Sequence, residues 1–263
     1  MDKLSSAGAM SVTDPGFRVW LPRVLSIVVW LCLWQLVVFL WQPDLLPGPG
    51  TVLQSLWQHM VHGDLVPQLG VTLRRLILAF VISLVLGMLV GLAMGHFRPI
   101  DQWCDSLLTL MLNVPALVTV ILCLMWFGLN EFAAITAVVI NKVPNMAVIF
   151  REGAKAVNHD LLAVAKVYRL SPGKTLRKVY LPQLSPYFLA ATRTGQALVW
   201  KIILVVELLG CSNGVGFKLS VFFQMFDIAS ILAYTLAFVV VIYLVESLLL
   251  RPWERRINRW RSS

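Results

Sequence analysis

The chain of 263 residues is 59% hydrophobic and only 13% charged, and its mean hydropathy is +0.79. Ordinary soluble domains carry about 25% charged residues, so this composition excludes a soluble globular protein and predicts an integral membrane protein. The net charge of +9 would also suit nucleic acid. Positively charged loops at the cytoplasmic face of a membrane explain this charge more simply, and we expect no nucleic-acid partner.

Six membrane spans are predicted in chain order. A helix needs about 20 mostly apolar residues to cross the hydrocarbon core, and four uncharged runs of 20, 22, 25 and 18 residues match this length. Two further apolar segments are interrupted by charges. The fold class is therefore an all-α membrane protein, with spans at about 24–41, 71–95, 106–127, 132–150, 185–208 and 229–250.

An N-terminal segment, 1–23, precedes the first span, and a basic tail, 251–263, follows the last. The first span is too long and wrongly flanked for a cleaved signal peptide, so we expect it to remain in the mature protein. The region between these ends, 24–250, is predicted to be one transmembrane domain. Its loops are too short for an ATPase or a receptor domain, which must then be other chains.

Positive charges orient the spans, because Lys and Arg accumulate in cytoplasmic loops. With the N-terminus inside, sixteen of the 22 Lys and Arg residues fall in cytoplasmic segments, and only Arg74, Arg75 and Lys218 fall in external ones. Both termini are therefore predicted to be cytoplasmic, together with a large basic loop, 151–184. The external segment 42–70 includes a short amphipathic stretch.

The basic loop contains Gly173-Lys174-Thr175, the last three letters of a phosphate-binding loop. That motif needs an earlier glycine at the position of Tyr168, and it follows a buried strand, whereas 160–168 has a helix-compatible pattern. We therefore expect this chain to bind no nucleotide or other cofactor. The cysteines have no paired spacing, and we expect no metal site.

Small residues recur every four positions in the second span, at Ser83, Gly87, Gly91 and Gly95. Such a face lets a neighbouring backbone approach closely in lipid, so we predict a helix-packing seam. The alternative is that membrane helices are simply rich in glycine. In the third span, Pro115 frees a carbonyl group and is predicted to bend the helix near Asn113.

Charges inside the spans are the sharper functional signal, because burying an unpaired charge costs about 2.5–3.5 kcal/mol even on a lenient insertion scale. Lys142 lies near the middle of the fourth span, and Lys201 and Glu207 lie along the fifth. We interpret these three residues, with Asn113, as candidates for a substrate pathway that carries an anion. The alternative for Lys201 and Glu207 is an ion pair with each other or with a neighbouring helix.

Several ordered segments carry a family resemblance. Residues 46–49 read Leu-Pro-Gly-Pro, 72–75 read Thr-Leu-Arg-Arg, and 126–131 read Trp-Phe-Gly-Leu-Asn-Glu. Further on, Glu207 precedes a glycine-rich stretch, 213–217. In order and spacing, over nearly the whole chain, these segments resemble the permease subunits of bacterial ATP-binding-cassette (ABC) importers. The resemblance is to the nitrate, sulfonate, taurine and bicarbonate branch.

The cytoplasmic signature of that family runs Glu-Ala-Ala, with a glycine at its seventh position and Leu-Pro at its nineteenth and twentieth. Aligned on Leu181-Pro182, this chain reads Ala-Val-Ala at 163–165 and has Arg169 where the glycine belongs. The glutamate and the glycine of the signature are therefore both replaced.

The resemblance implies a type I importer in the inner membrane. Its six-span permease would pair with a second copy in the lipid bilayer. Two ATPase subunits would bind ATP and Mg²⁺ below it, and a periplasmic binding protein would deliver a small anionic solute. The permease itself would not be an enzyme. The basic loop would form a coupling helix that seats on the ATPase, and the residues assigned to it are Asp160, Leu161, Ala163, Ala165, Arg169, Ser171, Gly173, Leu181 and Pro182.

Local patterns in the loop suit this role. Asp160 is predicted to cap a helix that begins near Leu161, and Ser171 and Pro172 are predicted to be the cap and first residue of a second helix. If the turn between the helices needs a left-handed residue, Arg169 costs roughly 1 kcal/mol relative to glycine.

Other functions fit the sequence less well. A membrane enzyme needs clustered His, Asp or Glu at one membrane face, but the pairs His59 with His62 and His159 with Asp160 lie on opposite faces. A self-sufficient secondary carrier or channel usually shows an inverted repeat, and none is evident. Within the importer family, permeases for pyrimidine-type vitamin precursors or aromatic compounds are alternatives.

Overall fold

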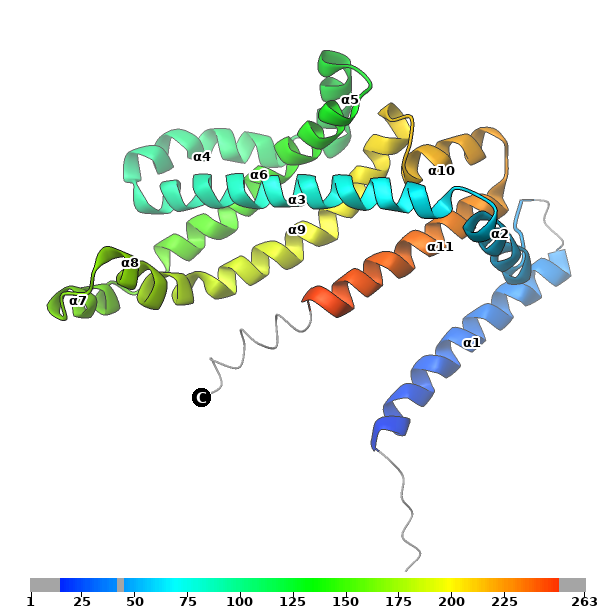
Figure 1. The fold of residues 1–263 in the computed structure, drawn as a ribbon, viewed down its shortest axis with the longest axis horizontal. Helices are drawn as coiled ribbons and strands as arrows, with labels where there is room; N and C mark the ends of the chain where they lie inside the picture. Colours follow the sequence, from blue (N-terminus) through cyan, green and yellow to red (C-terminus); the bar gives the residue numbers. More distant parts are fainter. Residues whose placement is uncertain (1–14, 42–44, 251–263) are drawn as a thin grey trace, which may run out of the picture.

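A computed structural model describes residues 15–41 and 45–250, and the regular elements in these ranges are all helices (Figure 1). The prediction of an all-α protein is therefore confirmed for the described residues. The elements are, in chain order, α1 (Pro15–Trp41), α2 (Pro49–Val61), α3 (Leu65–His96), α4 (Arg98–Asn113), α5 (Ala116–Phe127), α6 (Glu131–Lys155), α7 (His159–Val167), α8 (Pro172–Thr175), the π-helix η1 (Leu176–Tyr180), α9 (Leu181–Gly210), α10 (Val215–Gln224), α11 (Ile228–Val245) and the π-helix η2 (Glu246–Leu250).

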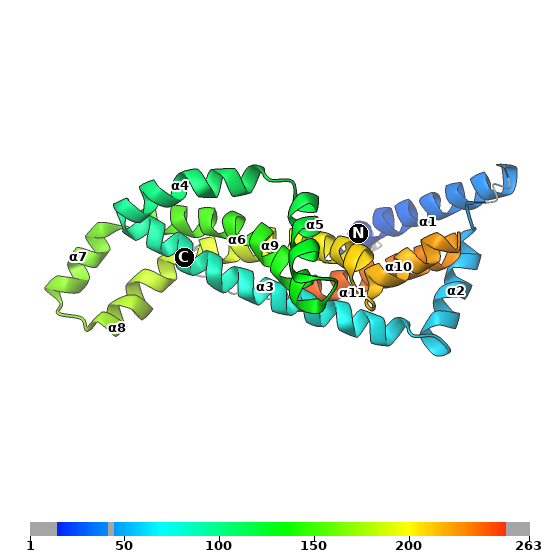
Figure 2. The ribbon, with the colours of Figure 1, turned by 90° about the horizontal axis from the view of Figure 1, so that it is seen from above.

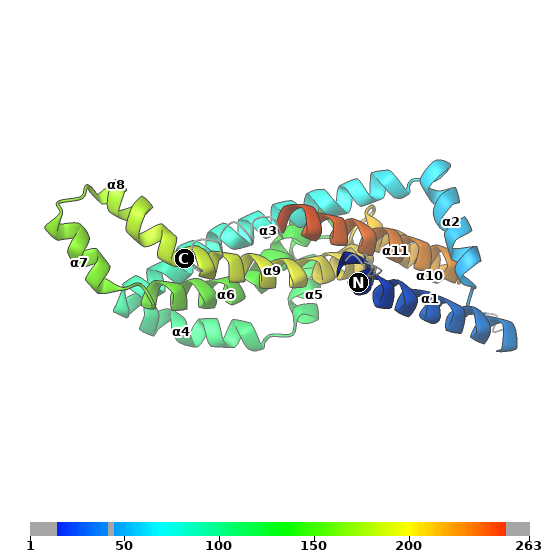
Figure 3. The ribbon, with the colours of Figure 1, turned by 90° about the horizontal axis from the view of Figure 1, so that it is seen from below.

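The long helices α3, α6 and α9 pack along one another and form the centre of an elongated bundle (Figures 1 and 2). Helices α7 and α8 lie at one end of this bundle, and α2 and α10 lie at the other. We call these the α7–α8 end and the α2–α10 end. Helix α11 runs along the bundle beside α9, where Trp200 contacts Phe238 (Figure 3).

Four helical stretches are long and apolar enough to cross a membrane: Leu65–His96, Glu131–Lys155, Pro172–Gly210 and Ile228–Leu248. Helices α4 and α5 would together make a fifth, broken span. The predicted first span corresponds to α1, whose described apolar stretch, Leu25–Leu40, is shorter than a full span. The described residues therefore hold four or five candidate spans by length and composition. The predicted tail 251–263 lies outside them, as does most of the segment 1–23.

The predicted third span is broken more sharply than the sequence suggested. Helix α4 already begins at Arg98, and it meets α5 at an angle of 96°. Pro115 explains the break, because it lacks an N–H group and forces the preceding Val114 into an extended conformation, with ψ of 124°. The helix therefore stops and starts again instead of bending.

The small residues of α3 lie on the side that contacts α6. A Cβ atom added at Gly87 would lie 2.5 Å from the Cβ of Met146, and one added at Gly91 would overlap the carbonyl oxygen of Ala147. A Cβ added at Gly95 would overlap the Cβ of Ala154. Ser83, one turn before Gly87, is fully buried. The two backbones therefore approach at a distance that larger side chains would prevent.

The fifth predicted span begins earlier than expected. Instead of a separate second loop helix and a span from residue 185, one helical stretch of 39 residues runs from Pro172 to Gly210. Pro182 cannot donate a backbone hydrogen bond, and the π-turn just before it, which ends with Leu181 N–H donating to the Leu176 carbonyl, accommodates it within the helix. The second half of the coupling loop, from Pro172 on, and the span therefore form one continuous helical rod.

Candidate functional site

The predicted coupling loop forms the tip of the α7–α8 end (Figure 1). We call residues 151–184 the coupling segment. It consists of the last turn of α6, all of α7, α8 and η1, and the first turn of α9. The segment therefore joins two of the long central helices, so a force applied to it would act on both.

The cap of α7 is Asn158, not the predicted Asp160. The Asn158 side-chain oxygen accepts hydrogen bonds from the backbone N–H groups of Asp160 at 2.7 Å and Leu161 at 3.4 Å. Helix α7 consequently begins at His159, and Asp160 lies in its first turn. The capping prediction was wrong by two residues, because Asn and Asp are almost equally good caps and both occur here.

Arg169 has a left-handed backbone, with φ of +48°. Its N–H donates to the Lys166 carbonyl at 2.9 Å, and the N–H of Leu170 donates to the Ala165 carbonyl at 3.0 Å. This pair of bonds is the Schellman arrangement that ends many helices, in which the residue at the position of Arg169 is usually glycine. Arginine therefore replaces glycine in this chain without removing the left-handed turn.

The second half of the coupling segment starts with Ser171 at the cap position and Pro172 as the first helical residue, although the Ser171 hydroxyl makes no capping bond. A Cβ added at Gly173 would meet open space. Leu181 is exposed, and Pro182 lines a groove between α7 and the start of the long rod.

That groove has a volume of about 440 Å³ and carries exposed apolar side chains on a segment rich in Lys and Arg. Tyr168, at its edge, is 76% exposed. Exposed apolar clusters with a polar rim mark interaction surfaces. We call it the docking groove, and its lining residues are Leu161, Val164, Ala165, Tyr168, Leu170, Lys178, Val179, Pro182 and Gln183.

The candidate pathway residues are not gathered in one place. Lys142, on α6, is only 4% exposed and has neither a hydrogen-bond nor an ion-pair partner among the described residues. Lys201, on α9, is exposed, and its ammonium group lies 5.5 Å from the centre of the Trp200 ring. Asn113 is exposed at the end of α4, where it donates to the Thr109 carbonyl.

Glu207 is fully buried at the α2–α10 end, and its carboxylate is shared between α3 and α10. One carboxylate oxygen accepts from the Arg75 guanidinium at 2.9 Å, and the other accepts from the Thr72 hydroxyl at 2.8 Å. Arg75 also donates to the backbone carbonyl and the side-chain oxygen of Asn213. An ion pair with a neighbouring helix, which was one of the two interpretations of Glu207, is what the structure contains.

The same cluster holds the start of α10. Three successive backbone N–H groups donate to side chains of α3 and α9: Gly214 to Gln68 at 2.5 Å, Val215 to Thr72 at 2.8 Å and Gly216 to Glu207 at 3.0 Å. The first N–H groups of a helix have no partner within the helix, so these bonds satisfy groups that would otherwise be buried unpaired. The position of α10 is thereby fixed relative to α3 and α9.

Gly214 is required where it stands. Its φ is +103°, and an added Cβ would lie 2.5 Å from each carboxylate oxygen of Glu207. A larger residue would therefore displace the carboxylate from Arg75. We call this group, Gln68, Thr72, Arg75, Glu207, Asn213, Gly214, Val215 and Gly216, the buried cluster.

Asp64 extends the polar contacts outward at the start of α3. Its carboxylate pairs with Lys218 at 2.6 Å and accepts from the Tyr234 hydroxyl at 3.0 Å and from Gln68 at 3.3 Å. Burial alone would raise the pKa of Asp64, but these hydrogen bonds and the charge of Lys218 outweigh it and lower that pKa. The interaction is therefore present at neutral pH and is lost in acid, below the ordinary carboxyl range.

Sequence reasoning missed Arg75 as the partner of Glu207. Arg75 was counted only as an external positive charge. The available signal was its position: Arg75 begins the second span at the same membrane face where Glu207 ends the fifth, and a buried carboxylate needs a cation.

Removing one partner of the buried pair should destabilise the protein strongly. In Glu207→Ala, the Arg75 guanidinium loses its counter-charge in a dry site, and we expect the free energy of unfolding to fall by about 3–5 kcal/mol. Thermal unfolding of the purified chain in detergent measures this loss. The matched control is Arg74→Ala, because Arg74 pairs with Glu131 on the exposed surface and should contribute less than about 1 kcal/mol. Equal stability of the two variants would contradict the assignment.

Glycine at position 169 should relieve the left-handed strain in the coupling segment. We expect Arg169→Gly to slow hydrogen exchange of the α7 amides, corresponding to a gain of roughly 1 kcal/mol in local stability. Lys174→Gly is the control, because the backbone there is helical and glycine should instead lower local stability by a similar amount. Faster exchange in Arg169→Gly would mean that the Arg169 side chain itself holds the turn.

Comparison with known proteins agrees with this architecture. The taurine transport system permease protein TauC of Escherichia coli is 27% identical to the chain and aligns over 89% of it and 88% of TauC. The nitrate import permease protein NrtB of Synechococcus elongatus is 25% identical, over 78% of this chain and 77% of NrtB.

Solved transporters share the fold. A chain of the MetNI methionine ABC transporter in an inward-facing conformation superimposes with a TM-score of 0.61, over 74% of this chain and 95% of that chain, at 16% identity. An amino acid ABC transporter chain gives the same TM-score at 24% identity.

Residues 83–260 match the family described as the binding-protein-dependent transport system inner membrane component. This match covers more than half of the chain and includes the coupling segment and Glu207. An ABC transporter of this kind works with ATPase and binding-protein partners. The chain therefore belongs to this family: it is an inner-membrane permease component of a binding-protein-dependent ABC transporter, and it is not itself the ATPase.

Proposed function

We propose that this permease is a six-span, type I importer subunit that forms the membrane pathway for a small anion of the nitrate, sulfonate, taurine or bicarbonate kind. A periplasmic binding protein delivers the anion. Two ATPase subunits bind ATP and Mg²⁺ and drive transport from the cytoplasmic side. A second copy of the permease completes the pathway.

The observation that carries this proposal is the docking groove. It presents apolar side chains, Tyr168 foremost, at the tip of a segment that joins α6 to the long rod ending in α9. A separate protein that seats in this groove can move both helices together, as an ATPase must do to rock the spans. The function of this chain therefore depends on binding another protein at the groove, not on catalysis by its own residues.

The orientation follows from charge. Placing the coupling segment in the cytoplasm also puts both termini there, with α1 as the first of six spans and the transmembrane domain at 24–250. The α2–α10 end then faces the periplasm and the binding protein. The coupling segment alone carries seven of the 22 Lys and Arg residues, and this concentration of positive charge supports the orientation.

The anionic nature of the cargo is supported by Lys142 and by the named substrates of the relatives. The Lys142 side chain is only 4% exposed; a lysine inside a membrane helix bundle is costly, and such residues mark ion or substrate pathways. Taurine and nitrate both carry a negative group that could pair with it transiently. Lys201, which is exposed on α9, would provide a second positive charge for the anion along the pathway.

A charge placed in the docking groove should detach the ATPase. We expect Tyr168→Asp to reduce the amount of ATPase that co-purifies with the permease by about tenfold or more, because one misplaced charge in an interface core costs about 2 kcal/mol. Phe223→Asp is the matched control, because Phe223 is a similarly exposed aromatic residue at the opposite end. Full ATPase recovery with Tyr168→Asp would place the docking surface elsewhere.

Neutralising the pathway cations should impair uptake without affecting assembly. We expect Lys142→Gln and Lys201→Gln each to lower uptake of radiolabelled taurine or nitrate about tenfold, with normal co-purification of the ATPase. Arg74→Gln is the control, because it removes a charge from an exposed surface pair outside both the pathway and the coupling segment, and it should transport normally. Wild-type uptake by both variants would contradict the proposal that an anionic solute passes Lys142 and Lys201.

A further inference from the structure

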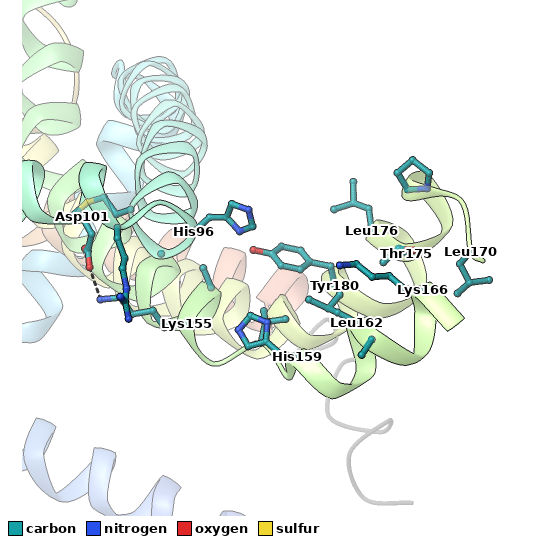
Figure 4. A pocket seen from close by; sticks show the side chains of 17 residues that line it. His96, Asp101, Lys155, His159, Leu162, Lys166, Leu170, Thr175, Leu176 and Tyr180 are labelled. Atoms are coloured by element: carbon teal, nitrogen blue, oxygen red, sulfur yellow. Dashed lines mark ion pairs between the residues drawn. The ribbon is translucent and has the colours of Figure 1, made fainter. Parts of the chain in front are cut away.

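A second, larger groove lies between the corner that joins α3 to α4 and the coupling segment (Figure 4). Its volume is about 1240 Å³, and of its lining residues only Leu170 also lines the docking groove. Its polar lining is almost entirely basic or neutral. We call it the basic groove, and the polar side chains that line it are His96, Arg98, Asp101, Lys155, His159, Lys166, Thr175 and Tyr180.

The charges in the basic groove are unbalanced. Among the described residues that line it, Asp101 is the only acidic one, and it is already paired with Lys155 at 2.9 Å and with Arg151 at 2.5 Å. Arg98 and Lys166 have no ion-pair partner among the residues that the structure describes. The groove therefore has two unused cations and should attract an anion.

The donors converge from both walls. In Figure 4, the His96 imidazole and the Tyr180 hydroxyl point toward each other across the groove, and Lys166 and His159 border the same space. His96 and Arg98 come from the α3–α4 corner, whereas His159 and Lys166 come from α7. An anion between them would connect the membrane domain to the coupling segment.

The surroundings favour a lipid over a free anion. Beside Arg98, the exposed apolar side chains are Phe97, just before α4, and Ile100 and Trp103 on α4, and Trp103 is 85% exposed. Tryptophan with basic residues is typical of the membrane interface, and basic pockets between helices on the cytoplasmic side bind acidic headgroups. The apolar residues can contact acyl chains while the basic residues face the phosphate.

We propose that the basic groove binds the phosphate headgroup of an acidic phospholipid, such as phosphatidylglycerol, and that this lipid ties α7 to the α3–α4 corner. The lipid would come from the cytoplasmic leaflet, and this assignment rests on the orientation given under the proposed function. The binding of an acidic headgroup does not depend on that orientation. The lipid would hold the coupling segment in place from the side opposite to its docking groove.

Lipid binding can be measured on the intact permease, in detergent and without transport. Native mass spectrometry with phosphatidylglycerol or phosphatidylcholine should show preferential retention of phosphatidylglycerol. We expect Arg98→Gln and Lys166→Gln each to weaken that retention about fivefold, as loss of one cation near an acidic headgroup predicts. Lys174→Gln is the matched control, because Lys174 lies in the coupling segment but does not line the basic groove. Arg98→Lys, which keeps the charge, should retain the lipid.

A second readout distinguishes a lipid from a free anion. In nanodiscs that contain phosphatidylglycerol, the amides of α7 should exchange more slowly than in phosphatidylcholine nanodiscs, and the double variant Arg98→Gln/Lys166→Gln should lose this difference. Equal retention of the two lipids by the wild-type chain would overturn the proposal, and so would undiminished retention by the double variant. Protection of α7 by inorganic phosphate in phosphatidylcholine would assign the groove to a soluble anion instead.

Discussion

The hydrocarbon core of a membrane offers no partner for a backbone amide or a charge, so every polar group placed there must be satisfied by the protein itself. The Glu207 carboxylate meets this constraint by accepting hydrogen bonds from Arg75, from Thr72 and from the N–H of Gly216. One carboxylate thereby neutralises a guanidinium and caps a helix. This arrangement joins α3, α9 and α10 at one end of the bundle.

The opposite end is connected to this cluster by a single rod. The helical stretch from Pro172 to Gly210 carries the coupling segment at its start and Glu207 near its finish. The glycine seam between α3 and α6 adds a second close contact along the bundle. A displacement at α7 and α8 would therefore be transmitted along α6 and α9 to the base of α10. Such long-range transmission is what an importer needs if its energy source and its solute receptor lie on opposite faces of the membrane.

The sequence predicted those features that depend on composition and local spacing. Uncharged runs located the long helices, and the four-residue spacing of small side chains identified the face of α3 that contacts α6. Features that depend on tertiary contacts were harder to predict. Asn158 and Asp160 are equally plausible caps until the path of the chain is known. Arg75 and Glu207 are 132 residues apart, and no local pattern connects them. The left-handed turn at Arg169 was expected only through the glycine that the family has there.

The central claim is that the coupling segment lies inside the cell and is moved by a separate enzyme. Its most direct test is thiol labelling of single-cysteine variants, made after the four native cysteines are replaced. A membrane-impermeant maleimide applied to intact spheroplasts should label Gly50→Cys on α2, and it should reach Lys174→Cys only after the membrane is opened. Labelling of Lys174→Cys in sealed spheroplasts, with Gly50→Cys protected, would contradict the account.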